Sequence, residues 1–205
     1  MVAGSHILPP RNASKENLRQ LHAMAVEARL EKARKGLQKY EPKLINHFAA
    51  GREVEPAKIQ PRLVEVRRDS KEELLFRYAC LHWSIPVSSG YGRRLRFLVV
   101  DEHNDKLMGL FGLGDPVFSL APRDRWVGWD KEGRRARLHH ALDAFVLGSV
   151  PPYSSLLCGK LIALLVASDE VREAFRRKYG GRSSVITERT LDGSLALITT
   201  TSATG

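Results

Sequence analysis

The sequence has little cysteine and no long apolar run. Only two of its 205 residues are cysteines, and they form no C-x-x-C pair, so we expect no disulfide framework and a reducing compartment. No stretch approaches the roughly 18 apolar residues that a membrane helix needs. The first residues also lack the basic and apolar regions of a secretory signal. We therefore expect a cytoplasmic protein with no membrane contact.

The familiar signatures of hydrolases and metalloenzymes are missing as well. The sequence contains neither G-x-S-x-G nor H-E-x-x-H, the motifs that present a serine nucleophile and a zinc ion. The adjacent pair His139-His140 has no further ligand at metal spacing, so no metal site is predicted. Asp124 and Tyr153 are the plausible catalytic acid or base candidates, and the sequence sets no distance between them.

Basic residues are what the chain has in excess. The formal net charge is +10, and such a surface favours contact with polyanions, because each phosphate contact releases counterions. The basic residues gather in short clusters, which are Arg67-Arg68, Arg93-Arg94-Arg96, Arg134-Arg135-Arg137 and Arg176-Arg177-Lys178. If these clusters converge in space they form a track for DNA. The alternative is a set of separate, solvated faces.

Helical patterns fill the first part of the chain. Ser14 is a candidate cap for a first helix, and the stretch 42–50 predicts a second, short one that ends at Gly51 as its C′ residue. The composition of 52–60 is that of a linker. The predicted units are residues 1–60, a basic helical segment with its linker, and residues 61–205, a single domain.

The second unit mixes strands and helices. Ser70 and Glu73 form the S-x-x-E pattern of a capping box, and 95–101 with 106–113 has the β-former content of a hairpin. The other predicted elements are a strand at 62–66, a helix at 131–140, a buried strand at 141–150, helices at 156–166 and 169–179, and strands at 184–188 and 194–201 joined by a hairpin turn at Asp192-Gly193. This order predicts an α+β fold with a mostly antiparallel sheet. Because the chain stops straight after a strand, we expect a C-terminal truncation.

The best candidate site is the stretch V-P-P-Y-S-S-L-L-C-G-K at 150–160. Its two prolines end a strand, since proline cannot donate to a β-ladder. Ser154 or Ser155 can cap the next helix, whose start attracts phosphate, while Gly159 permits close approach and Lys160 adds charge. These four residues are the predicted cofactor-binding set. The alternative is a structural strand-to-helix connection.

A second candidate is the segment R-D-R-W-V-G-W-D at 123–130. Arginine with tryptophan suits phosphate contact and base stacking, whereas an Arg–Asp brace under core tryptophans explains the same residues structurally. Asp124 stays ionised in either case, since arginines flank it. The predicted nucleic-acid-binding residues are Arg93, Arg94, Arg123, Arg125, Trp126, Trp129, Arg134 and Arg135.

Together these motifs resemble a known family. The run L-R-F-L-V-V-D, the return strand G-L-F-G-L-G-D, the segment A-P-R-D-R-W-V-G-W-D and the turn V-P-P-Y-S-S-L-L-C-G-K-L look like the DruA family of the Druantia antiphage defence system, over about residues 60–205. The resemblance implies a bacterial defence protein, with other proteins of the defence system as its partners.

The order of hairpin, strand, turn and helix also resembles the GNAT acyltransferase fold. In that fold the helix start after the turn receives the pyrophosphate of acetyl-CoA, which implies acetyl-CoA or a related acyl-CoA as a cofactor at 154–160. Of the usual Q/R-x-x-G-x-G/A turn, only Gly159 is present. Phage DNA-modification proteins of the Mom type look like relatives of this branch, which implies DNA as a partner.

Three functions follow as hypotheses. The first is a prokaryotic antiphage defence or mobile-element protein that binds or acts on DNA through a GNAT-like domain. The second is an acyl-CoA-dependent N-acyltransferase that modifies a protein or a small amine. The third is a non-catalytic scaffold of a defence complex. The sequence leaves open whether the chain is an enzyme.

Overall fold

The computed structural model describes residues 14–84, 87–88, 90–183 and 190–200. Its centre is a sheet with the strand order β1-β2-β3-β4-β5. The strands are β1 (Pro61–Glu65), β2 (Arg94–Asp101), β3 (Lys106–Gly114), β4 (Ala141–Ser149) and β5 (Leu197–Thr200). Neighbouring strands from β1 to β4 are antiparallel, and β5 is parallel to β4. The predicted α+β class with a mostly antiparallel sheet is confirmed.

Two of the helices, at 15–37 and 71–81, begin directly after the serine caps that the sequence predicts. The helices are α1 (Lys15–Leu37), α2 (Glu41–Leu44), α3 (Lys71–Leu81), α4 (Ala121–Val127), α5 (Lys131–Arg137), α6 (Cys158–Leu165) and α7 (Asp169–Tyr179). Ser14 Oγ accepts a hydrogen bond from the Asn17 N–H, and Ser70 Oγ accepts one from the Glu73 N–H. The Glu73 carboxylate accepts from the Asp69 N–H instead of the Ser70 N–H, so the capping box is shifted by one residue.

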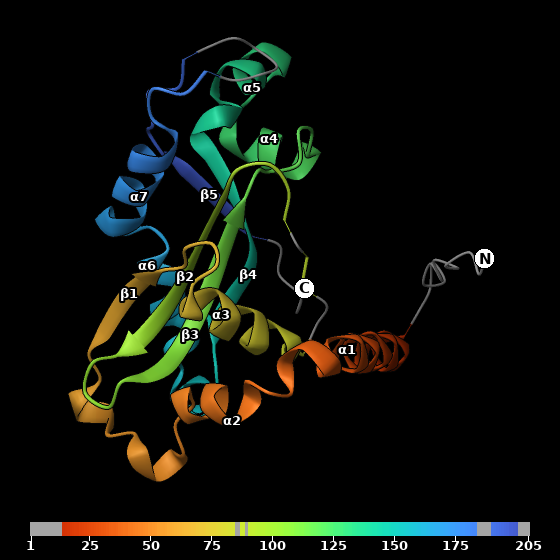
Figure 1. The fold of residues 1–205 in the computed structure, drawn as a ribbon. Helices are drawn as coiled ribbons and strands as arrows, with labels where there is room; N and C mark the ends of the chain where they lie inside the picture. Colours follow the sequence, from red (N-terminus) through yellow and green to blue (C-terminus); the bar gives the residue numbers. More distant parts are fainter. Residues whose placement is uncertain (1–13, 85–86, 89, 184–189, 201–205) are drawn as a thin grey trace.

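Helices cover both faces of the sheet in three layers (Figure 1). Successive side chains of a strand point to opposite faces. On β2, Leu95, Phe97 and Val99 join the core under α6 and α7, whereas Leu98 joins a second core that includes α3 and the end of α1. The central strands are therefore buried on both faces. Segments α4 and α5 lie beyond the sheet, at the end where β3 stops and β4 begins.

Two predicted helices differ from the observed ones. In place of one helix at 42–50, α2 ends at Leu44, and 3₁₀ turns follow at Ile45–His47 and Gly51–Glu53. The backbone is extended at Phe48, which brings its ring against Tyr78 in the core; Gly51 therefore begins a turn and is not a C′ residue. The helix predicted at 156–166 begins two residues later, at Cys158.

The last strand has a partner that the sequence did not predict. Asp192 Oδ1 accepts from the Ser194 N–H, and Gly193 has a φ of +76°, so the chain bends at these two residues. Leu197–Thr200 then pairs in parallel with Ala141–Ala144 of β4. The stretch 184–188, the predicted hairpin partner, lies outside the described residues, so the hairpin itself stays a prediction.

Part of the predicted N-terminal unit packs on the sheet. Leu37 and Leu44 belong to the second core, and the Gln60 N–H donates to Asp101 Oδ1 at the end of β2. The division at residue 60 stays a prediction. Among the helices in the described ranges, none is both long enough and apolar enough to cross a membrane.

Candidate nucleic-acid interface

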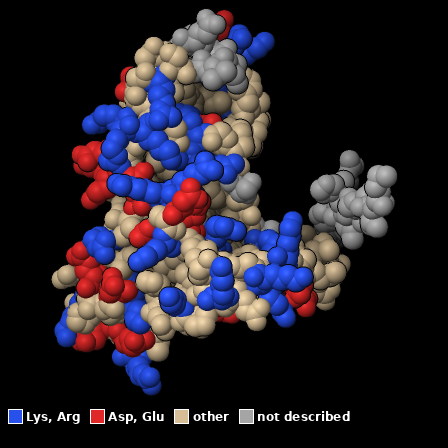
Figure 2. Space-filling model, in the orientation of Figure 1, with Lys and Arg blue, Asp and Glu red and all other residues tan. Residues whose placement is uncertain are grey.

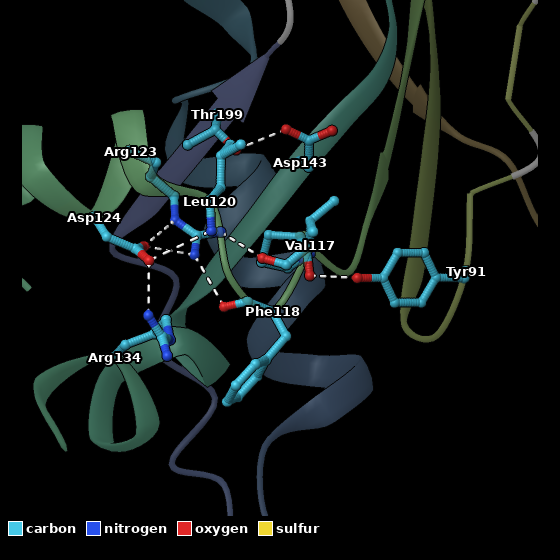
Figure 3. Close-up of polar contacts among 10 residues, drawn as sticks. Tyr91, Val117, Phe118, Leu120, Arg123, Asp124, Arg134, Asp143 and Thr199 are labelled. Atoms are coloured by element: carbon cyan, nitrogen blue, oxygen red, sulfur yellow. Dashed lines mark hydrogen bonds and ion pairs between the residues drawn. The ribbon is translucent and has the colours of Figure 1, made fainter. Parts of the chain in front are cut away.

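A buried aspartate organises the segment that follows β3 (Figure 3). Asp124 on α4 is only 5% exposed. The Arg123 guanidinium donates to Asp124 Oδ1 from Nε at 2.9 Å and from Nη2 at 2.7 Å. Arg134 of α5 donates to Asp124 Oδ2 at 2.9 Å. This three-residue brace fastens α5 to α4.

The brace keeps the carboxylate charged and holds its arginines. Burial alone would raise the pKa of Asp124, but the hydrogen bonds and charges of Arg123 and Arg134 outweigh it and leave the pKa below its usual 3.8. Arg123 also donates to the carbonyls of Val117 and Phe118. Its donors are thus committed within the protein. An Arg–Asp brace is therefore present for Arg123, and Arg134, which was predicted as a DNA contact, joins it through one ion pair; DNA contact by either arginine stays a prediction.

The neighbouring residues have the opposite exposure. Trp126 is 84% exposed, so the idea that both tryptophans belong to the core is wrong for this one. Trp129 is half-buried, with the Arg123 guanidinium over its ring at 5.8 Å. Arg125 and Arg135 are exposed, and among the described residues neither lies within ion-pair distance of a carboxylate. Arg125, Trp126 and Arg135 therefore stay available to a ligand.

The approach to β2 is fixed by a second, half-buried ion pair. Arg93 Nε donates to Asp115 Oδ1 at 2.7 Å, and its other nitrogens donate to the carbonyls of His139 and Ala141. Gly92 has a φ of +65°, and a Cβ there would lie 1.9 Å from Asp115 Oδ2, so this position requires glycine. The Arg93 guanidinium therefore makes its hydrogen bonds within the protein, whereas the next residue, Arg94, is exposed.

Arg94 stands where several basic segments meet. The Tyr179 hydroxyl and Lys178 Nζ, both at the end of α7, donate to the Arg94 carbonyl. Arg177 pairs with Glu65 at the end of β1, and the Val66 N–H donates to the Arg96 carbonyl. Figure 2 shows Lys and Arg gathered over α7 and the adjoining end of the sheet. We call this surface the basic face; its members are Arg67, Arg68, Arg94, Arg96, Arg176, Arg177, Lys178 and Arg182.

The basic face holds more positive charge than the fold neutralises. The carboxylates that pair with it are Glu65, Asp69 and Glu73. Partial burial is the main cause that places the pKa of Lys178 below its usual value, and the charges of Arg96 and Arg182 lower it further. Together these effects outweigh the negative charge of Glu65, which raises this pKa. Like charges that crowd in this way are relieved when an anion binds.

The opposite end of the sheet is closed by a buried hydrogen-bond network. Tyr153 lies in a 3₁₀ turn (Tyr153–Leu156) and is fully buried. Its hydroxyl donates to Asp101 Oδ2 at 2.9 Å, and Asp101 Oδ1 accepts from the N–H groups of Gln60 and His103. Burial raises the pKa of Tyr153 to about 12. These contacts join the 3₁₀ turn of Tyr153 to the end of β2 within the core, so Tyr153 has a structural role.

Asp124 and Tyr153 cannot act on one substrate atom. Tyr153 bonds Asp101 at the β2–β3 turn, whereas Asp124 follows the far end of β3, beyond Gly114. Strand β3 has nine residues, and the eight steps between its ends span roughly 26 Å at about 3.3 Å per residue. The two candidates therefore do not form one acid–base pair, and a catalytic role for either one alone stays a prediction.

The predicted cofactor set lies near Tyr153 but without the expected cap. Leu157, with a φ of +59°, holds the N-cap position of α6, and no side chain caps that helix; capping by Ser154 or Ser155 was wrong, because both serines sit in the preceding 3₁₀ turn that buries Tyr153. A Cβ on Gly159 would meet only Ser149 Oγ, at 3.5 Å, so no neighbour needs glycine there. Lys160 is exposed, and acyl-CoA binding by this set stays a prediction.

With this geometry in place, the sequence was compared with known families. The profile of the family described as Druantia protein DruA matches residues 12–205. The chain belongs to the DruA family. The match includes the Asp124 brace, the basic face and the 150–160 turn.

A curated relative gives the same result. The chain is 47% identical over 192 residues to the Druantia protein DruA of Escherichia coli (strain UMEA 4076-1), and the match covers 94% of this chain and 48% of that protein. The chain thus spans about half the length of this DruA relative. No solved structure matches, so the likeness to the GNAT fold stays a prediction.

Sequence reasoning missed two parts of these sites. Arg182 was not singled out, because it stands alone after Gly180-Gly181 and reaches the basic face only through the fold. Asp101 was read as the end of a strand, although an aspartate beside a turn with Asn104 is a common acceptor for turn N–H groups. The Arg67-Arg68 and Arg176-Arg177-Lys178 clusters were noted in the sequence, and their place beside Arg94 comes from the pairing of β1 with β2.

Proposed function

We propose that this chain is the DNA-binding part of an antiphage defence protein, and that the basic face makes the contact. Membership of the DruA family supports the defence role. The observation that supports DNA binding is an excess of cations over carboxylates on one surface, where the ends of β1 and α7 meet the start of β2 (Figure 2). A phosphate backbone is the polyanion that spaced arginines on a rigid scaffold fit.

The rigidity of this surface favours a backbone partner over a small anion. Each cluster is anchored by main-chain or side-chain contacts to another element, such as Lys178 to the Arg94 carbonyl and Arg96 to Glu73. The cations are distributed along several elements and do not converge on one enclosed pocket. Such an arrangement gives binding that does not depend on base sequence and weakens steeply with salt.

A charge-neutralising variant tests the proposal. The triple variant Arg67→Gln, Lys178→Gln, Arg182→Gln removes three exposed cations and leaves a shorter, neutral and polar side chain at each position. The matched control is Lys32→Gln, Lys35→Gln, Lys43→Gln, which removes the same charge from exposed positions of α1 and α2. In a fluorescence-anisotropy titration with a labelled duplex at about 100 mM salt, we expect the first variant to lose at least about tenfold in affinity and the control to lose less than about threefold. Equal losses would show that only net charge matters.

A phage-protection assay tests the biological half. Cells that carry the complete defence system with the basic-face variant should lose plaque reduction, whereas cells with the control variant should keep it. Immunoblots must show equal amounts of both proteins. Full protection by a basic-face variant that no longer binds DNA would favour the scaffold hypothesis.

A further inference from the structure

An exposed apolar set lies beside the Asp124 brace. Val117 is 58% exposed, Phe118 55% and Trp126 84%, and Leu120 is also exposed. We call these four residues the α4 apolar patch. Large apolar side chains at this exposure are usually scattered, whereas here they fall within ten residues of sequence on the segment that the brace holds. An exposed apolar group of this kind marks a binding surface.

The α4 apolar patch is held rigid from below. Arg123 donates to the carbonyls of Val117 and Phe118, and the Tyr91 hydroxyl donates to the Pro116 carbonyl. The Arg134 guanidinium lies 4.9 Å from the centre of the Phe118 ring. Figure 3 shows the Phe118 ring projecting from this loop on the side of Arg134. A prearranged aromatic surface binds with little further loss of conformational entropy.

Two exposed cations lie close to this patch in the sequence. Arg125 adjoins Trp126 on α4, and Arg135 follows Arg134, whose guanidinium lies against the Phe118 ring. Tyr91 ties the patch segment to the approach of β2, and Arg94, three residues further, belongs to the basic face. Exposed aromatic rings with cations close by suit unpaired bases, which stack while the phosphates contact the cations.

We propose that Phe118 and Trp126 stack on unpaired bases of single-stranded DNA, with Arg125 and Arg135 along its backbone. The proposal rests on DNA binding by the basic face and narrows the substrate to DNA with an unpaired segment. In a duplex the faces of the bases are buried by stacking on one another, so no base face is exposed on which a protein ring could stack. A protein partner is disfavoured because the cations beside the patch would need to be desolvated or matched by carboxylates.

Binding measurements on three matched probes test this inference. The probes are a 20-nucleotide DNA strand, its duplex and the RNA strand of the same sequence. For Trp126→Ala we expect a loss of about 5-fold to about 150-fold in affinity for the DNA strand, in keeping with one lost stacking contact, and less than about threefold for the duplex. Trp126→Phe should restore most of the affinity. The matched control is Leu164→Ala, which removes an exposed apolar side chain from α6 and should change neither affinity.

Several outcomes would overturn the inference. Unchanged strand affinity in both Trp126→Ala and Phe118→Ala would exclude stacking, and so would equal losses for strand and duplex. Stronger binding of the RNA strand than of the DNA strand would assign the patch to RNA. A shift from dimer to monomer in Trp126→Ala, measured by light scattering, would assign it to a second copy of the chain. Failure of the wild-type protein to bind any probe would instead overturn the proposed function itself.

Discussion

A buried aspartate lies beyond each end of strand β3, Asp101 at the end of β2 and Asp124 on α4. The two carboxylates differ in the groups that donate hydrogen bonds to them. Asp101 accepts from a tyrosine hydroxyl and two backbone N–H groups, and the 3₁₀ turn with Tyr153 closes over it. Asp124 accepts from two arginines, and the segment around it leaves Trp126, Phe118 and Arg125 exposed. At the Asp101 end, uncharged donors form a hydrogen-bond network within the core. At the Asp124 end, charged donors hold a segment that exposes aromatic and basic side chains.

This difference separates stability from binding. At the closed end every polar partner is internal, so a substitution there should change the free energy of unfolding and leave ligand affinity alone. At the charged end the buried residues position the exposed side chains. A substitution of a buried residue there should therefore change both the free energy of unfolding and the ligand affinity. The largest effects are expected where a buried charge loses its partner, since such an ion cannot return to water without unfolding.

The brace should give the largest effect on stability. Asp124→Ala leaves Arg123 buried without its carboxylate, and we expect a loss of about 3–5 kcal/mol in the free energy of unfolding. Because Arg123 also holds the Val117 and Phe118 carbonyls, affinity for single-stranded DNA should fall as well. Urea unfolding followed by circular dichroism measures the first effect and anisotropy the second. A loss below about 1 kcal/mol would contradict the brace.

The closed end should give a smaller loss and no loss of binding. Asp101→Ala leaves the N–H groups of Gln60 and His103 without their acceptor and the Tyr153 hydroxyl with only Asn104 Oδ1, which should cost about 2–3 kcal/mol. The same unfolding and anisotropy measurements apply. A fall in DNA affinity by more than about threefold in the folded variant would contradict the claim that this end affects stability and leaves binding unchanged.

The brace also predicts a pH dependence. The pKa of Asp124 is lower in the folded chain than its usual 3.8, so its contribution to stability is fully present above pH 3.8 and is lost as the pH falls through the folded value. Wild-type stability should therefore drop below about pH 4 more steeply than that of Asp124→Asn, which cannot titrate there. Identical slopes in urea unfolding across pH 3 to 6 would show that Asp124 titrates alike in both states.

The exposed tryptophan should give the smallest effect on stability. Trp126→Ala removes a side chain that is 84% exposed, so the free energy of unfolding should change by no more than about 0.5 kcal/mol, although strand affinity falls. A loss above about 2 kcal/mol would mean that Trp126 packs in the folded chain and is no free stacking surface.

Local patterns predicted most of the fold. The S-x-x-E signal placed α3, and the β-formers flanking the Asn104-Asp105 turn placed the hairpin, because both depend on residues close in sequence. The pairing of Leu197–Thr200 with β4 was missed, since a parallel partner is set by long-range packing. The capping serines of the 150–160 turn failed because burial of Tyr153 overrides the local preference for a cap.

The site was only half visible in the sequence. The segment 123–130 suited both a brace and a nucleic-acid contact. The structure shows that Arg123 and Asp124 are buried on α4, whereas Arg125 and Trp126 are exposed. Sequence spacing on a short helix gives that division only when the direction of the core is known. The fold supplies that direction.

The most direct test of DNA binding by the basic face is the salt dependence of the binding constant for a duplex. The account predicts that the logarithm of the constant falls linearly with the logarithm of salt concentration, and that Arg67→Gln, Lys178→Gln, Arg182→Gln makes the slope shallower by about 2 to 3, at about 0.9 for each lost phosphate contact. A slope near zero for the wild-type protein, or the same slope in both proteins, would contradict it.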